Sequence, residues 1–132
     1  MLTLTQADQE EIDRTTDYTL EQCGDAAVEC ESKVTISVDG EFFTEGYLDM
    51  YCPARRKLFD LKTGQRYDDR IQLSGYALGL MQRDECMEIE CHIIYSAENK
   101  VDVFVVTRSE AEDIARRVRN RITNPTASPI PN

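Results

Sequence analysis

Hydrophobic and polar residues alternate along the first half of the chain. Val28, Cys30, Val34, Ile36 and Val38 fall on one side of an alternating segment, interrupted only by Ser32, which predicts a strand with one buried face. Asp39-Gly40 then predicts a tight turn into a second strand, Glu41 to Tyr51. Asp49 lies late in that strand, where alternation places it on the face of Tyr47 and Tyr51. Gly46 permits a bulge or a close backbone approach.

The remaining segments predict two further helices, three further strands and a modest helix near residues 6–23. A stripe of Leu73, Ala77, Leu80 and Met81 predicts a helix over 70–83, and a capping box at 109–112 predicts the start of the last helix. Alternation predicts strands over 57–62, 87–95 and 101–107. This order of elements predicts an α/β fold in which a mixed β-sheet is flanked by helices.

Length and composition are those of one folded domain. The chain has 132 residues, of which 41% are hydrophobic and 30% charged, and this excludes wholesale disorder. We expect a single domain over 1–123 and an extended proline-rich tail over 124–132. No apolar run reaches the length of a membrane span and residues 1–6 lack the features of a signal peptide, so we expect no membrane partner and a cytoplasmic location.

The cysteines and the single histidine do not indicate a disulfide framework or a catalytic site. The five cysteines, at 23, 30, 52, 86 and 91, show neither a C-x-x-C pair nor the spacing of a disulfide framework, so we expect free, buried thiols. The single histidine, His92, falls on the polar side of a late strand. We therefore expect it to be exposed.

Charge argues against a simple DNA-binding domain. The formal net charge is −10, whereas binding to a phosphate backbone depends on Lys and Arg. Two basic groups are exceptions: Arg55-Arg56-Lys57, and the arginines of the last helix. For the latter, the spacing of Glu112 to Arg116 and of Asp113 to Arg117 predicts ion pairs along the helix.

Two carboxylates and a lysine form the candidate chemical site. Asp60 and Lys62 are two apart on one strand, so their side chains share a face with Leu58. Mg²⁺ takes one or two carboxylates together with substrate oxygens, and Asp49 and Asp60 suffice for that. Lys62 would hold the attacking water or offset negative charge that develops in the reaction.

The order of these residues resembles a known motif series. Gly46 to Asp49 matches G-x-x-D, Asp60 to Gly64 matches D-x-K-T-G, and Gln72 to Tyr76 matches Q-x-x-x-Y. In this order the chain resembles the RecB-like exonuclease branch of the PD-(D/E)XK nuclease superfamily. The resemblance implies a restriction-endonuclease-like core.

The same resemblance implies roles for individual residues. Asp49, Asp60 and Lys62 would be catalytic, and Asp49, Asp60 and the Leu61 carbonyl oxygen would bind Mg²⁺ or Mn²⁺. Gln72 and Tyr76 would position DNA. Glu31 is a further candidate metal ligand, because relatives place an acid on the strand before the G-x-x-D hairpin; the alternative is a solvated strand glutamate.

The implied activity is that of a metal-dependent deoxyribonuclease, exonuclease-like, which acts in DNA repair, recombination, or phage or defence DNA processing. Three alternatives stay open. The chain could be a nuclease-fold module for binding or regulation with weak catalysis, or an acidic protein-interaction domain. It could also be a nuclease that requires a helicase, recombinase or other protein to deliver DNA.

Overall fold

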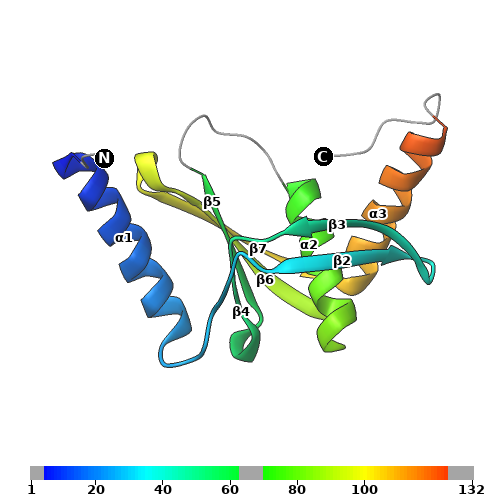
Figure 1. The fold of residues 1–132 in the computed structure, drawn as a ribbon, viewed down its shortest axis with the longest axis horizontal. Helices are drawn as coiled ribbons and strands as arrows, with labels where there is room; N and C mark the ends of the chain where they lie inside the picture. Colours follow the sequence, from blue (N-terminus) through cyan, green and yellow to red (C-terminus); the bar gives the residue numbers. More distant parts are fainter. Residues whose placement is uncertain (1–4, 63–69, 125–132) are drawn as a thin grey trace.

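A computed structural model describes residues 5–62 and 70–124. In this part of the chain a five-stranded sheet has the order β1-β4-β5-β6-β7, and β2 and β3 form a separate hairpin (Figure 1). The strands are β1 (Glu29–Cys30), β2 (Lys33–Val38), β3 (Glu41–Tyr47), β4 (Met50–Cys52), β5 (Lys57–Lys62), β6 (Glu88–Tyr95) and β7 (Lys100–Thr107). The helices are α1 (Gln6–Cys23), α2 (Arg70–Asp84) and α3 (Arg108–Thr123), with short 3₁₀ turns at Pro53–Arg55 and Ser96–Glu98.

The sheet is mixed, as the pattern of elements predicts. β5 and β6 are parallel, and α2 lies between them in sequence, whereas β4–β5 and β6–β7 are antiparallel. Parallel neighbours need a crossover connection, and a helix supplies it. The predicted α/β class is therefore confirmed, with a sheet and flanking helices consistent with a restriction-endonuclease-like core.

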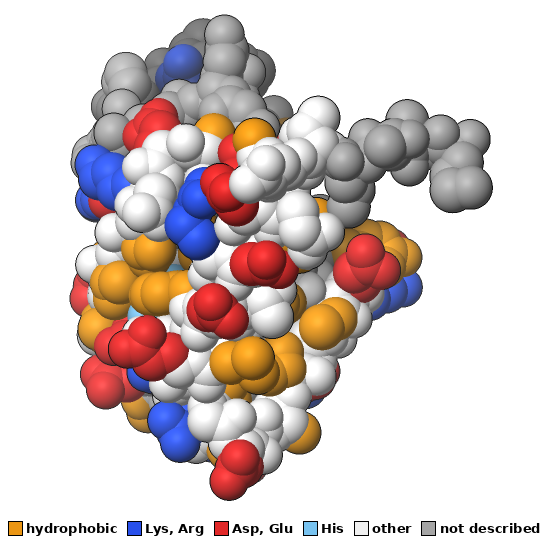
Figure 2. Space-filling model, turned by 90° about the vertical axis from the view of Figure 1, so that its left-hand side faces the viewer, with side chains coloured by type: hydrophobic (Ala, Val, Ile, Leu, Met, Phe, Trp, Pro, Cys, Tyr) orange, Lys and Arg blue, Asp and Glu red, His pale blue; other side chains and the backbone are white. Residues whose placement is uncertain are grey.

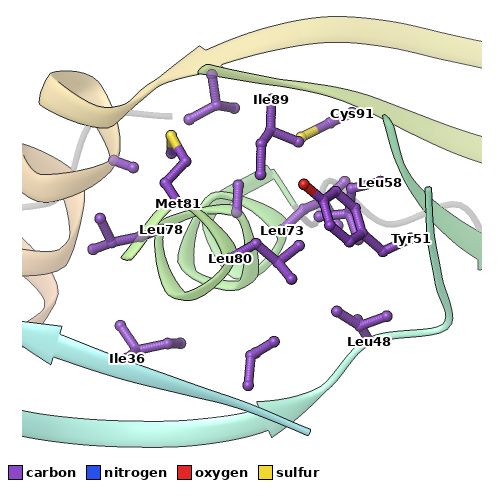
Figure 3. Close-up of a cluster of buried hydrophobic side chains, with 14 of the residues drawn as sticks. Ile36, Leu48, Tyr51, Leu58, Leu73, Leu78, Leu80, Met81, Ile89 and Cys91 are labelled. Carbon is purple, nitrogen blue, oxygen red and sulfur yellow. The ribbon is translucent and has the colours of Figure 1, made fainter. Parts of the chain in front are cut away.

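Helix α2 packs between the hairpin and the sheet. Figure 3 shows its side chains meeting Ile36 and Leu48 on one side and Leu58, Ile89 and Cys91 on the other. The predicted stripe is correct, because Leu73, Ala77, Leu80 and Met81 are all buried. Gly79 allows the close approach, since a Cβ there would stand 2.9 Å from the Thr35 carbonyl oxygen.

Helix α1 covers the opposite face of the sheet. Cys23, Cys52, Phe59 and Ile94 form the buried centre of this second cluster, with Tyr18 packed against it. A capping box at Thr5 and Asp8 starts the helix, and Gly24 ends it with a positive φ of 57°. Ile12 and Leu20 point outward, although they are the helix's large apolar residues.

The predicted hairpin forms, but both of its strands are broken. Asp39 and Gly40 have positive φ, as a tight turn with the hairpin twist requires. The strands predicted over 28–38 and 41–51 each split, because Glu31 adopts a left-handed conformation (φ 51°) and Leu48–Asp49 lie between β3 and β4. Glu31 N–H still donates to the Asp49 carbonyl, and Leu48 N–H to that of Ser32, so pairing continues through the bend.

The last helix begins two residues earlier than its sequence predicts. The N-cap is Thr107, whose side-chain oxygen accepts from Glu110 N–H at 3.2 Å, and not Ser109. The Thr107 hydroxyl also donates to the Glu110 carboxylate at 2.9 Å, so Thr107 and Glu110 take the places that the sequence assigned to Ser109 and Glu112. Ala111 and Ala115 are buried on the predicted face.

The sheet ends at β7, which pairs within the described residues with β6 alone. Val101 of this strand packs against the cluster under α1, whereas Val103 and Val105 are 52% and 51% exposed. Among the described residues no helix is long and apolar enough to cross a membrane.

Three cysteines match the prediction of free, buried thiols. Cys23, Cys52 and Cys91 are buried and free, and Cys86 is half-buried. Cys30 is exposed, which the prediction missed because the left-handed turn at Glu31 follows it directly. The proline-rich tail over 124–132 lies, from residue 125 on, outside the described residues.

Candidate active site

Asp49 lies in the break between β3 and β4, next to β5. Its Oδ2 accepts a hydrogen bond from Leu61 N–H at 2.8 Å. Because the ladder between β4 and β5 ends at the Met50–Phe59 pair, the carboxylate takes the place of the next strand partner. The predicted grouping of Asp49 with Tyr47 and Tyr51 is wrong: the bend leaves Tyr47 65% exposed and buries Tyr51 completely.

Asp60 and Lys62 share a face of β5, as alternation predicts. Their neighbour Leu58 packs against α2, whereas Phe59 and Leu61 pack toward α1. Lys62 Nζ lies 3.0 Å from Asp60 Oδ2, and the two side chains are only 18% and 15% exposed. The ion pair is thus largely withdrawn from solvent.

The two carboxyl groups influence each other. The pKa of Asp60 is raised to about 6, because burial and the nearby Asp49 carboxylate raise it by more than Lys62 lowers it. A protein interior that keeps two carboxylates together disfavours a second negative charge. A cation between them would relieve that cost.

Tyr76 of α2 faces the same place. Gln72 Nε2 donates to the Tyr76 hydroxyl oxygen at 3.0 Å, so the two side chains share one face of the helix. Burial raises the pKa of Tyr76, and the charges of Asp60 and Asp49 raise it further. The hairpin approaches at Gly46, where a Cβ would collide with the Tyr76 ring.

The structure therefore brings together Asp49, Asp60, Lys62, Gln72 and Tyr76 from β5, α2 and the break before β4. Glu31 does not join them. Its side chain is exposed, and no group of three His, Cys, Asp or Glu side chains in the described residues could hold a metal ion. Thr63 and Gly64 of the motif series, and the cap expected at 67–69, lie outside the described residues.

The donor atoms present fit a hard divalent cation. Asp49 and Asp60 offer two carboxylates, which is what Mg²⁺ commonly takes from a protein. Leu61 N–H points toward Asp49, and in a strand the carbonyl of the same residue points to the same side. The Leu61 carbonyl oxygen would then lie on the side of β5 where β4 has ended, where it could serve as a third donor.

The basic residues of the last helix are engaged in ion pairs, as predicted for two of them. Arg116 contacts Glu112 at 3.4 Å and Arg117 contacts Asp113 at 3.2 Å. Asp39 of the hairpin turn also binds Arg116 and Arg119, at 2.9 and 3.0 Å. These arginines hold α3 to the hairpin.

The group Arg55-Arg56-Lys57 is similarly engaged. Lys57 Nζ donates to the Gln22 side chain at 2.8 Å, Arg55 donates to the Gln22 carbonyl at 3.2 Å, and Arg56 pairs with Asp84 at 3.7 Å. Acidic side chains are spread over the face turned to the viewer in Figure 2. The described surface on that side therefore offers no continuous basic path for a phosphate backbone.

The prediction that His92 is exposed is also wrong. This residue is 2% exposed and lies on the α1 side of the sheet, stacked near Phe59. Nε2 lies 2.7 Å from Glu90 Oε2, and Nδ1 hydrogen-bonds the Tyr18 hydroxyl. The apolar run Ile93-Ile94-Tyr95 carries the signal, because a strand apolar on both faces is covered on both.

Comparisons with known proteins yield only distant structural likenesses. No family model matches the chain, and no curated protein matches it. The chain is similar to the solved structure of SSO0001, with 16% identity and a TM-score of 0.49 over 92% of this chain and 60% of that one. It is also similar to a phage-related exonuclease from Haemophilus somnus 129PT, with 12% identity and a TM-score of 0.43 over 92% of this chain and 73% of that one. The chain thus spans about 60% of the length of the first, and both scores are too low to establish its activity.

Proposed function

We propose that this protein is a metal-dependent nuclease that hydrolyses phosphodiester bonds in DNA. The observation that carries the proposal is the convergence of Asp49, Asp60 and Lys62. Gln72 and Tyr76 of α2 lie beside them, and Asp49 reaches β5 only because the chain bends between β3 and β4. A chance strand with the pattern D-x-K would not have a second carboxylate fixed beside it.

Each residue has a role that its surroundings support. Asp49, Asp60 and the Leu61 carbonyl oxygen would hold Mg²⁺ or Mn²⁺, which supplies Lewis-acid stabilisation of the phosphoryl group when bound. Lys62 would orient the attacking water or offset charge on the phosphate, since its ammonium is held 3.0 Å from Asp60. Gln72 and Tyr76 would hold a phosphate oxygen next to that site.

A DNA-delivering partner would complement this site. The net charge is −10, and the basic residues of α3 and of the segment before β5 are committed to internal contacts. Because non-specific affinity for DNA comes mainly from Lys and Arg, the chain alone would bind DNA weakly. A helicase or recombinase that holds DNA would supply that affinity.

Replacing Lys62 tests the proposal. Purified protein is expected to cleave single- or double-stranded DNA with Mg²⁺ or Mn²⁺, and Lys62→Ala should lower the rate by at least about 100-fold. Lys62 is mostly buried and paired, so its loss leaves Asp60 without its cation and costs more stability than an exposed lysine would. Lys62→Met, which keeps the aliphatic stem, should show the same loss of rate.

Lys57→Ala is the matched control, because Lys57 lies on the same strand but contacts Gln22 and Glu90 on the other face. It should cleave at the wild-type rate. Absence of cleavage by the folded wild-type chain, with either metal and with a DNA-holding partner present, would contradict the proposal and leave a nuclease-fold binding module.

A further inference from the structure

An apolar groove of about 250 Å³ lies next to the candidate site, between the hairpin and helices α2 and α3. Its walls come from β3, the first two turns of α2 and the middle of α3. Aromatic and aliphatic side chains dominate them: Phe43, Tyr76, Ile71, Ile36, Ile114 and Val118.

The groove continues into the candidate site. Gln72 and Tyr76, which hydrogen-bond each other at 3.0 Å, line the groove and also belong to the site. The Tyr76 ring also lies against Gly46, three residues before Asp49, because a Cβ at Gly46 would collide with it. A molecule with one part at the carboxylates could therefore place its next part in the groove.

The lining excludes a phosphate group from the groove. Of the described residues that line it, Glu45 alone is charged, and Lys33 pairs with its carboxylate at 2.9 Å. The remaining polar groups are the hydroxyl and amide groups of Thr44, Gln72 and Tyr76. Such a surface suits a flat, mostly apolar ring with a few polar atoms at its edge.

We propose that the groove binds an unpaired nucleobase of the DNA strand whose phosphate lies at Asp49 and Asp60. The inference rests on the proposed nuclease function and adds a base-binding subsite to it. A volume of about 250 Å³ is below the range of about 300–1,000 Å³ for larger ligands, which suits a single base. A base in a duplex is paired and stacked on its neighbours, so only an unpaired base can enter.

Two neighbouring phenylalanines provide the test. Phe43 lines the groove, whereas Phe42, next to it on β3, is 65% exposed and lies outside the groove. Phe43→Ala should weaken binding of single-stranded DNA by about fivefold to a hundredfold, the range for losing one base–aromatic stack. Phe42→Ala should leave it unchanged.

Gly75→Leu is a second variant that does not remove a core contact. A Cβ at Gly75 would meet only Ile36, at 3.6 Å, so a leucine there can extend into the groove without displacing backbone. It should fill the groove and weaken binding as Phe43→Ala does. Circular dichroism of each variant checks the fold.

The probe is a labelled oligothymidylate, compared by fluorescence anisotropy at low ionic strength with an abasic strand of equal charge. Ca²⁺ replaces Mg²⁺ in this measurement, so that a divalent cation still joins the phosphate to the two carboxylates while cleavage is suppressed. We expect wild-type protein and Phe42→Ala to prefer the base-containing strand, and Phe43→Ala and Gly75→Leu to bind both strands equally. A blunt duplex should be insensitive to all three substitutions.

Equal binding of the two strands by wild-type protein, or normal preference in Gly75→Leu, would overturn the subsite. If metal-dependent cleavage persists in that case, the proposed function stands without it. If base-dependent binding is seen but the wild-type chain cleaves nothing, the subsite is supported and the nuclease function fails. A groove that instead binds a partner protein's apolar side chain would show no difference between the strands.

Discussion

The charged form of the Asp60 carboxyl group is disfavoured. Burial and the neighbouring Asp49 carboxylate, opposed by Lys62, raise the pKa of Asp60 to about 6. Protons and a divalent cation compete for such a group. At a pH of about 8 the carboxylate is ionised and should bind metal, whereas at about pH 5 it is mostly protonated.

The first prediction at the scale of the residue concerns this competition. Mn²⁺ at about 100 times its dissociation constant should stabilise the wild-type fold by about 3 kcal/mol at pH 8. It should have a much smaller effect at about pH 5, and Asp60→Asn should abolish the effect at both. Thermal unfolding with and without metal measures this, with the exposed Asp113→Asn as control; an equal shift at both pH values would contradict it.

The second prediction at this scale concerns His92. Burial lowers the pKa of this residue, and the effect of burial outweighs that of Glu90, which raises it. Because the unfolded chain binds the proton more tightly, this residue contributes stability that is present above about pH 6.5 and is lost as the pH falls below it. We expect His92→Gln to lose less stability than wild type between about pH 8 and pH 5.5. Asp60, with its raised pKa, acts in the opposite direction below about pH 6, but it is common to both proteins and cancels in the comparison.

Tyr18→Phe is the control for this measurement, because it removes one hydrogen bond to His92 but keeps the titrating ring. Its stability should decline toward acid as in wild type. If His92→Gln declines as steeply as wild type, another group is responsible.

At the scale of the element, helix α2 contains two glycines in different surroundings. Gly75 has room for a methyl group, whereas at Gly79 a Cβ would stand 2.9 Å from the Thr35 carbonyl oxygen and 3.2 Å from Val34 Cβ. Alanine favours a helix, so Gly75→Ala should stabilise the fold by about 0.5–1 kcal/mol. Gly79→Ala should destabilise it by about 1–3 kcal/mol, because the hairpin must move away.

Chemical denaturation of the two variants measures this difference. They are each other's control, since both remove a glycine from the same helix. Stabilisation by Gly79→Ala would show that the hairpin is not held against α2 as described.

Elements whose conformation depends on neighbouring residues in the sequence could be predicted, whereas elements whose conformation depends on tertiary packing could not. Asp39-Gly40 turns the hairpin through its own backbone preferences, and the stripe on α2 follows from helical period. The break at Glu31 and Leu48 instead arises because the hairpin leaves the sheet to cover α2, which no local pattern encodes. The alternation that joined Asp60 and Lys62 was local, but the approach of Tyr76 and the burial of His92 depend on neighbouring elements.

At the scale of the whole molecule, the distribution of charge predicts how DNA binding depends on salt. Arg116 and Arg119 are bound to Asp39, so these two arginines contribute little to the release of counterions from DNA. We expect the isolated chain, without metal, to bind duplex DNA weakly, with a log–log salt slope smaller in magnitude than about 3. Anisotropy titrations over a range of salt measure it.

Arg116→Ala should leave that slope unchanged, while it loosens α3 from the hairpin. A steep slope, or one that falls by about one for each arginine removed, would mean that α3 contacts phosphates directly. A shallow slope that steepens when a DNA-holding protein is added would agree with delivery by a partner.

The exposed edge strand β7 affects how the protein behaves in concentrated solution. An edge strand with Val103 and Val105 half exposed presents N–H and C=O groups that the described chain does not pair, beside an apolar surface. Such an edge is a template on which another strand can add. Lys100 and Asp102 lie toward one end of β7, so its valine-rich remainder is a segment from which aggregation can start.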